Sequence, residues 1–202
     1  MPLVMQRVAE CREMRLNSTD KATQKLAETP TTFRETYNPN TYVIIPSTSS
    51  ENRKYIPIGF LDSNVISTNA NLIIPNAEIY HFGVLISNVH MAFMRAVAGR
   101  LEMRYRYSKD IVYNNFPFPE PTPEQKERIE RTAQAILNAR ALYPDCSLAD
   151  LYDELAMPSE LRKAHQANDL AVMNAYGFDK KITESECVAE LMKMYQKLTG
   201  GK

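Results

Sequence analysis

The sequence lacks several of the residues on which common protein chemistries depend. It contains no tryptophan, only six glycines and only three cysteines among 202 residues. Cys11, Cys146 and Cys187 are far apart and odd in number, so we expect unpaired thiols in a reducing compartment and neither a disulfide framework nor a zinc site. No run approaches the ~20 apolar residues of a membrane span, and the N-terminus lacks a signal-peptide pattern. We therefore predict a cytoplasmic protein with no membrane partner.

Motifs for catalysis are missing as well. The chain has no Gly-x-Gly sequence, with which many enzymes cradle a nucleotide or a phosphate. His81, His90 and His165 are far apart and poorly flanked by carboxylates or thiols, so their spacing does not suggest a metal site. For His90 we favour a polar residue at the edge of the core over a phosphate contact. We predict no catalytic residue, no metal ligand and no cofactor site within these 202 residues.

The composition nevertheless supports folded cores, with 44% hydrophobic and 24% charged residues. The net charge of zero conceals an uneven distribution. Residues 1–119 contain 13 Lys and Arg against 10 Asp and Glu, a balance of +3, whereas residues 120–202 contain 11 against 14, a balance of −3. If the protein binds an anionic partner, the first part is the one expected to do so.

A proline-rich connector separates these two parts. The stretch FPFPEPTP has prolines at 117, 119, 121 and 123, which neither a helix nor a central strand accommodates. We therefore predict one domain over residues 1–119 and a second over residues 120–202.

The second part has the pattern of successive capped helices. The predicted starts are Thr122–Pro123 with Gln125, Ser147 with Asp150, Pro158, and Thr183 with Glu186, and Gly177 is the expected end of the third helix. Apolar residues at helical spacing follow these starts, including Leu148, Leu151 and Leu155 in the second helix. This pattern predicts a small all-α domain.

The first part has a mixed pattern. Short β-branched runs bounded by Pro or Gly predict strands at 41–46, 54–60 and 71–75. Residues 82–99 predict one helix that ends at Gly99, residues 110–116 a returning strand, and residues 5–28 one or two short helices. The predicted fold class is thus α+β: a mixed, largely antiparallel β-sheet domain with packed helices, followed by the small all-α domain.

The most basic stretch of the first part is GRLEMRYRYS, residues 99–108. Its charged residues and the lysine that follows are Arg100, Glu102, Arg104, Arg106 and Lys109. Arginines that alternate with tyrosines suit a surface that meets an anion. In a strand, Glu102, Arg104 and Arg106 would share one face, and Met103 and Tyr105 would turn toward the core or the next strand. The plain alternative is a surface ion pair between Glu102 and one of the arginines, worth less than ~1 kcal/mol.

Three long stretches resemble the C-terminal part of the MmeI-like enzymes. They are VIIPSTSSENRKYIPIGF, FGVLISNVHMAFMRAVAGRLEMRYRYSKDIVYNNFPFP and SLADLYDELAMPSELRKAHQANDLAVMNAYGF, and the resemblance runs from about residue 7 to residue 178. In these bacterial type II restriction–modification enzymes, a nuclease, a helical connector and an adenine methyltransferase precede a target-recognition domain and a small helical domain. The resemblance implies that this chain holds the last two parts, without either catalytic centre, and is inactive by itself.

The resemblance also implies cofactors and partners outside the chain. The parent enzyme would use S-adenosylmethionine for methylation of adenine in DNA and Mg²⁺ for cleavage, both at sites upstream. The expected partners are double-stranded DNA and the methyltransferase domain of the same polypeptide. An RNA-binding module and a protein-interaction module that docks a partner on its acidic helical half stay open as alternatives.

The stretch after Gly-Arg-Leu belongs to the specificity-determining surface of the family, and the resemblance therefore favours base reading by Glu102, Arg104 and Arg106. A carboxylate can accept from the exocyclic amine of cytosine, and a guanidinium can donate twice to guanine. Asn69 is a further candidate, because Asn favours a bidentate contact with adenine; a plain turn is the equal alternative. The candidate phosphate contacts are Ser49, Ser50, Arg53, Lys54, Arg95, Arg100 and Lys109. A solvated loop is the alternative for the first four, and a pairing within the domain is the equal alternative for Arg100.

Overall fold

The computed structural model describes residues 1–34 and 37–200 and falls into two units, residues 1–38 and 39–202. The first unit contains α1 (Pro2–Leu16), α2 (Lys21–Lys25) and the 3₁₀-helix η1 (Leu26–Glu28). The guanidinium of Arg15 joins α1 to the segment after α2, since it donates to the carbonyl oxygens of Leu26 and Thr29 at 2.8 Å and of Thr32 at 2.7 Å. The short helices expected within residues 5–28 are confirmed, although α1 starts earlier, at Pro2.

The second unit contains two small antiparallel sheets. The first has the strand order β3–β1–β4, formed by β1 (Thr41–Pro46), β3 (Gly59–Asp62) and β4 (Asn71–Pro75). In the central strand, Val43 pairs with Phe60 on one side and with Ile74 on the other. Val43 is fully buried, so this sheet forms one wall of the core. The strands expected at 41–46 and 71–75 are confirmed.

The strand expected at 54–60 is wrong over most of its length. Only Gly59 and Phe60 belong to β3, and residues 54–58 form a loop. Pro57 has no N–H group for a sheet, and the N–H of Ile58 donates to the carbonyl of Ile56 at 2.9 Å in a tight three-residue turn. Ile56 and Ile58 are still buried. The apolar run therefore predicted burial correctly, but not the backbone conformation.

The second sheet has the order β2–β6–β5, from β2 (Thr48–Ser49), β6 (Arg104–Arg106) and β5 (Gly99–Leu101). Its outer strands are remote in sequence, because β2 follows β1 directly whereas β5 and β6 form a hairpin after the central helices. The basic stretch 99–108 thus lies in a hairpin that is held against the segment after β1.

Residues 82–99 form two helices where one was expected: α3 (Ile79–Leu85) and α4 (Asn88–Val97). The chain breaks at Ser87, whose hydroxyl accepts the N–H of His90 and so caps α4. Apolar spacing continues across the break because both helices are buried. Gly99 is not the end of the helix; Ala98 already has an extended backbone, and Gly99 begins β5.

The strand expected at 110–116 is also wrong. Residues Lys109–Tyr113 form a π-helical turn, η2, in which Val112 is buried. The hydroxyl of Ser108 accepts the N–H of Ile111 and opens this turn, and the side chain of Asn115 closes it by donating to the Asp110 carbonyl at 2.9 Å. Polar side chains that satisfy backbone groups locally have replaced a sheet ladder here.

The C-terminal helices begin where their capping residues predicted. They are α5 (Pro123–Ala141), α6 (Leu148–Leu151), α7 (Ser159–Tyr176) and α8 (Glu184–Leu198). Thr122, Ser147 and Thr183 each form a complete capping box, and Gly177 ends α7 with a φ of +71°. One expectation fails: α6 stops at Leu151, and Leu155 is 98% exposed.

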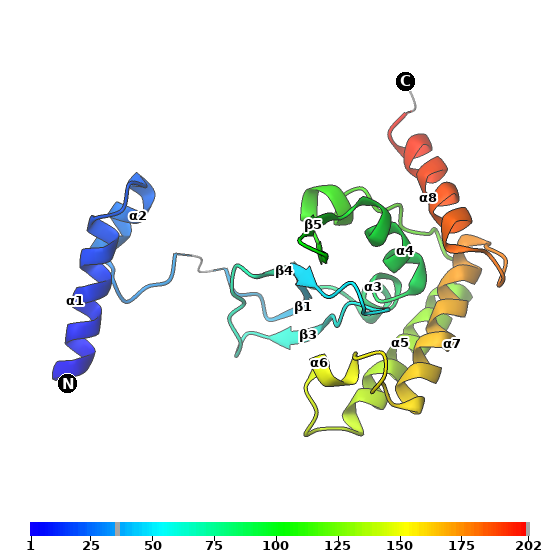
Figure 1. The fold of residues 1–202 in the computed structure, drawn as a ribbon, viewed down its shortest axis with the longest axis horizontal. Helices are drawn as coiled ribbons and strands as arrows, with labels where there is room; N and C mark the ends of the chain where they lie inside the picture. The colour runs from blue at the N-terminus through cyan, green and yellow to red at the C-terminus, as the bar shows by residue number, and fades with distance from the viewer. Residues whose placement is uncertain (35–36, 201–202) are drawn as a thin grey trace. The chain divides into compact units, whose positions relative to one another are not determined.

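The α+β class is confirmed, and the helices and sheets share one core. Figure 1 shows α5 and α7 side by side, and α3 and α4 lie between this pair and the strands, with α8 against α4. The buried cluster contains Phe82 from before the connector and Ile129 and Val172 from after it. The predicted boundary between residues 119 and 120 thus falls within a continuous core, and it stays a prediction. In the part of the chain that the structure describes, no helix is long and apolar enough to cross a membrane.

Candidate nucleic-acid interface

The basic stretch is a β-hairpin with a two-residue turn. Leu101 lies opposite Arg104, and Glu102 and Met103 connect the two strands. Glu102 has a φ of +58°, in the left-handed region that disfavours residues with a Cβ atom. The expected continuous strand is therefore wrong at its start, and Met103, which we expected to face the core or the next strand, is 69% exposed.

The second strand of the hairpin does present the expected face. Arg104 and Arg106 are both exposed, whereas Tyr105 between them is 7% exposed and belongs to the core. The alternation of β6 thus directs two guanidinium groups to solvent on one side. Among the described residues, the guanidinium of Arg106 has no hydrogen-bond or ion-pair partner, so its side-chain donors are available to a ligand.

Glu102 and Arg104 lie together, as both interpretations of this stretch required. Arg104 Nη2 lies 2.7 Å from Glu102 Oε2, and the two side chains are 49% and 76% exposed. An exposed ion pair of this kind contributes at most about 1 kcal/mol. It uses one carboxylate oxygen and one arm of the guanidinium, which leaves Oε1 of Glu102 and further N–H groups of Arg104 free for a ligand.

Arg100 stiffens the hairpin from its other side. Its guanidinium stacks on the ring of Tyr105, with 3.8 Å from Cζ to the ring centroid, and its Nη1 donates to the Met103 carbonyl at 3.0 Å. Both contacts fix the turn relative to the strand. Arg100 thereby has a structural task within the hairpin, although its side chain is exposed.

The structure brings the turn that carries Asn69 to the same neighbourhood as the hairpin. Thr48 of β2 pairs with Arg106, and the preceding residue, Ser47, donates from its N–H and its hydroxyl to the carbonyl of Ala70 at 3.0 Å and 2.5 Å. The exposed Asn69 is the neighbour of Ala70 in that turn. This link could not be predicted from the sequence, because it depends on the pairing of a two-residue strand with a hairpin more than fifty positions away.

The loop that follows β2 carries three of the predicted phosphate contacts. Ser50 and Arg53 are partly exposed and Lys54 is exposed, with its ammonium group 5.3 Å from the ring centroid of Tyr55. Lys109, at the start of η2, has a 65% exposed side chain whose Nζ lies 3.6 Å from Asp110 Oδ1. All four side chains can turn toward an anion from solvent.

Two of the predicted phosphate contacts do not fit that role in this structure. Ser49 is 3% exposed, and its hydroxyl is buried without a hydrogen-bond partner among the described residues. Arg95 is 21% exposed and is engaged elsewhere: its Nε and Nη2 each lie 2.8 Å from a carboxylate oxygen of Glu184, and Nη1 donates to the Lys54 carbonyl. These contacts attach α8 to α4. The burial of Ser49 and the pairing of Arg95 both depend on tertiary contacts, which could not be predicted from the sequence.

We expected His90 at the edge of the core, but the structure places it inside the core. It is 1% exposed, with Nδ1 2.6 Å from the Leu85 carbonyl and Nε2 3.0 Å from the hydroxyl of Tyr107. Burial lowers its pKa to about 4, so the ring is neutral near pH 7. A buried neutral imidazole does not contact phosphate.

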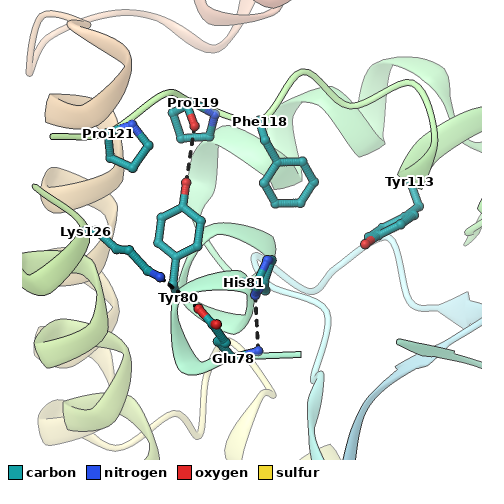
Figure 2. Close-up of a pocket in the computed structure, with 8 residues that line it drawn as sticks. All are labelled: Glu78, Tyr80, His81, Tyr113, Phe118, Pro119, Pro121 and Lys126. Atoms are coloured by element: carbon teal, nitrogen blue, oxygen red, sulfur yellow. Dashed lines mark hydrogen bonds and ion pairs between the residues drawn. The ribbon is translucent and has the colours of Figure 1, made fainter. Parts of the chain in front are cut away.

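A separate pocket of about 560 Å³ lies between the start of α3, the connector and α5 (Figure 2). It is lined by Glu78, Tyr80, His81, Tyr113, Phe118, Pro119, Pro121 and Lys126. Its charged groups pair with each other, Lys126 Nζ to Glu78 Oε2 at 2.9 Å, and this pairing lowers the pKa of Glu78 and raises that of Lys126. The pocket therefore offers ring surfaces and a paired carboxylate and ammonium group.

Comparison with known proteins places the chain in a family. Residues 1–120 match the MmeI target recognition domain, and residues 121–201 match the MmeI C-terminal domain. The chain belongs to the MmeI target recognition family. The resemblance inferred from the sequence is thereby confirmed, and the two matches meet at the proline-rich connector.

The relatives of this MmeI-type chain are much longer than it is. It is 42% identical over 199 residues to DNA methyltransferase A of Bacillus subtilis (strain 168). The aligned region covers 98% of this chain and 22% of that protein. It is 52% identical, with a TM-score of 0.93, to a solved type IIL restriction-modification enzyme, MmeI, in complex with DNA. That match covers 99% of this chain and 27% of the enzyme, so the chain spans about a quarter of the length of these relatives.

Proposed function

We propose that this chain recognises a specific sequence in double-stranded DNA on behalf of a larger restriction–modification methyltransferase. The observation that carries the proposal is the exposed Glu102–Arg104 pair at the tip of a basic hairpin. Support comes from the family, since one relative is a DNA methyltransferase and another was solved in complex with DNA.

In the proposed mode of binding, the hairpin enters the major groove and the pair reads one C·G base pair. The free carboxylate oxygen of Glu102 accepts from the exocyclic amine of cytosine, and the remaining N–H groups of Arg104 donate to O6 and N7 of guanine. Because the two side chains already contact each other at 2.7 Å, they reach the two bases in a fixed relation. Bidentate readout of this kind discriminates by about 1–3 kcal/mol against the wrong base.

The neighbouring side chains extend this surface. Arg106 has free donors on the same face of β6, and Asn69 lies on the turn that Ser47 ties to β2, so we assign both to base edges beside the first pair. We assign Ser50, Arg53, Lys54 and Lys109 to phosphate contacts. Arg100 supports the hairpin and reaches the DNA backbone only at the rim of the interface. Ser49 and Arg95 are left out of the proposal, for the reasons given above.

We further propose that the catalytic steps belong to other parts of the whole protein. S-adenosylmethionine would serve methylation of adenine and Mg²⁺ any cleavage, and no residue of this chain is assigned to either. The chain would act by holding and reading the duplex while the methyltransferase extrudes the target base. Division into a recognition domain, residues 1–119, and a helical C-terminal domain, residues 120–202, is part of this proposal.

The proposal is tested by selecting bound duplexes from a pool of random sequence with the 202-residue chain. The comparison is with the double variant Glu102→Lys, Arg104→Asp, which exchanges the charges. A matched control exists on α8, where Glu190 and Lys193 also form an exposed pair at 2.7 Å, and the variant Glu190→Lys, Lys193→Asp exchanges those charges. We expect the first variant to prefer a different base at one position and the control to keep the original motif.

The outcomes separate the proposal from its rivals. Binding that is equally weakened on every sequence by the Glu102 and Arg104 exchange would overturn base reading. Preference for single-stranded RNA over duplex DNA in competition would favour an RNA-binding module. Absence of duplex binding, or binding with a flat salt dependence, would favour a protein-interaction module, since phosphate contacts release counterions.

A further inference from the structure

The tip of the hairpin exposes apolar side chains as well as charges. Met103 is 69% exposed and Leu101, the partner of Arg104 in the hairpin, is 44% exposed. Neither belongs to the buried core or to the partly buried residues packed against it. Exposed turns usually carry Gly, Asn, Asp or Ser, so an unpacked methionine at this position contributes nothing evident to the fold.

The backbone of Met103 is held in place while its side chain is free. Arg100 binds the Met103 carbonyl at 3.0 Å and stacks on Tyr105, whose side chain is anchored in the core. On either side of Met103 in the sequence lie Glu102 and Arg104, joined by their ion pair. A flexible apolar side chain is thus fixed at its root between the two proposed base readers.

The major groove offers an apolar side chain one chemical feature. Base edges there carry hydrogen-bonding groups, apart from the C5-methyl group of thymine, which 5-methylcytosine also bears. Methionine is long, unbranched and polarizable, and it adapts to irregular apolar surfaces. In the proposed mode of binding, a side chain of this type beside the Glu–Arg pair would reach the pyrimidine C5 position of an adjacent base pair.

We propose that Met103 contacts the C5-methyl group of a pyrimidine in the base pair next to the one read by Glu102 and Arg104, which makes recognition sensitive to that methyl group. This inference rests on the proposed function and adds a ligand group to it. The contact removes from water an area similar to one methylene group, which corresponds to about fourfold in affinity.

The experiment uses the duplex enriched by the chain and derivatives that differ by one methyl group. Thymines within two base pairs of the C·G pair are replaced singly by uracil, and cytosines singly by 5-methylcytosine, and dissociation constants are measured. For the unchanged chain we expect about fourfold weaker binding when one particular methyl group is removed, or about fourfold tighter binding when one is added. Met103→Ala should bind both members of that duplex pair equally, and Met103→Leu should keep most of the difference.

A matched control is Met14→Ala, because Met14 is 62% exposed on α1, outside the hairpin. It should respond to the methyl group as the unchanged chain does. The inference is overturned if the unchanged chain ignores the methyl group at every position, or if Met103→Ala still responds. Exchange of the C·G pair in the same titrations reports on the proposed function separately. A chain that discriminates C·G but not the methyl group overturns only the role of Met103, and a chain that binds no duplex overturns both.

Discussion

Glu102 and Arg104 meet at 2.7 Å across the end of a hairpin turn in which Glu102 keeps a left-handed backbone, with φ of +58°. The ion pair is exposed and contributes at most about 1 kcal/mol, whereas the left-handed conformation costs a residue with a Cβ atom roughly 1–2 kcal/mol. Glycine would suit this turn better. The proposed base contact therefore explains the carboxylate at position 102 better than a stabilising role in the fold does.

The first prediction follows because the left-handed backbone of Glu102 costs more free energy than its ion pair contributes. Glu102→Gly should leave the free energy of unfolding unchanged or raise it by up to about 1 kcal/mol, because glycine adopts a positive φ without strain. The same variant should lose its preference at one base pair in the duplex selection. Urea unfolding gives the first quantity. Met103→Gly, at the next position and outside the left-handed region, is the control and should lower stability. A marked loss of stability in Glu102→Gly would show that the carboxylate supports the fold.

The second prediction separates phosphate contacts from arginines that hold the fold. Lys109→Ala should reduce the slope of log K against log salt by about one, because one fewer counterion is released on binding. Arg95→Ala should keep that slope but lower the free energy of unfolding by about 1–3 kcal/mol, because it releases α8 from α4. Titrations of labelled duplex at several salt concentrations test the slopes. A reduced slope for Arg95→Ala, without loss of stability, would return Arg95 to the binding surface.

Features determined by neighbouring residues could be predicted from the sequence. The capping boxes at Thr122, Ser147 and Thr183 each involve a residue three positions away, and the structure has all three. The α+β class and the antiparallel strands at 41–46 and 71–75 were predictable from β-branched runs and their Pro boundaries. The basic stretch 99–108 was predicted to be a charged surface, since its arginines are close together in the sequence.

Features determined by remote residues could not be predicted. The pairing of Thr48 with Arg106 joins a strand of two residues to a hairpin, and two residues carry no usable periodicity. The turn at Glu102 lacks the Asn-Gly or Asp-Gly sequence that signals a hairpin, so the stretch resembled one strand. The burial of Ser49 and the pairing of Arg95 with Glu184 depend on chain segments that meet only in the folded state.

The third prediction concerns the close approach of α3 to α5 and α7. A Cβ atom on Gly83 would lie 2.8 Å from Cγ2 of Ile129 and 2.9 Å from Cβ of Ala133. Gly83→Ala should therefore lower the free energy of unfolding by about 1–3 kcal/mol through overpacking. Gly99→Ala is the matched control, since its added methyl group meets only a backbone oxygen at 4.0 Å. Thermal unfolding of both variants tests this, and equal melting temperatures would contradict the observed packing.

Two buried histidines link the helices to the sheet side of the core. His165 stacks on Tyr55 with ring centroids 4.2 Å apart, and its Nε2 lies 2.7 Å from the hydroxyl of Tyr152. Tyr55 in turn donates to Asp169 at 2.7 Å. His90 is bound on both nitrogens, as described above. None of these groups is exposed, so their protonation is coupled to unfolding and not to ligand binding.

The fourth prediction is that acid destabilises the fold through these histidines. Burial lowers the pKa of His90 to about 4 and that of His165 to about 3, from an ordinary value of 6.5. Between pH 6.5 and about 4, the unfolded chain binds protons that the folded chain excludes, so the free energy of unfolding falls as pH falls through this window. Burial raises the pKa of Asp169, which acts in the opposite direction and offsets part of the loss.

At pH 5 we expect each histidine to have lowered the free energy of unfolding by on the order of 2 kcal/mol relative to pH 7. Urea midpoints at the two pH values measure the sum. His165→Gln should be less stable at pH 7, because a well-packed ring is lost, but its stability should change less between pH 7 and pH 5. His81→Gln, at a partly exposed position on α3, should keep the full change. Identical midpoints at both pH values in the unchanged chain would show that the two rings are not held neutral by the fold.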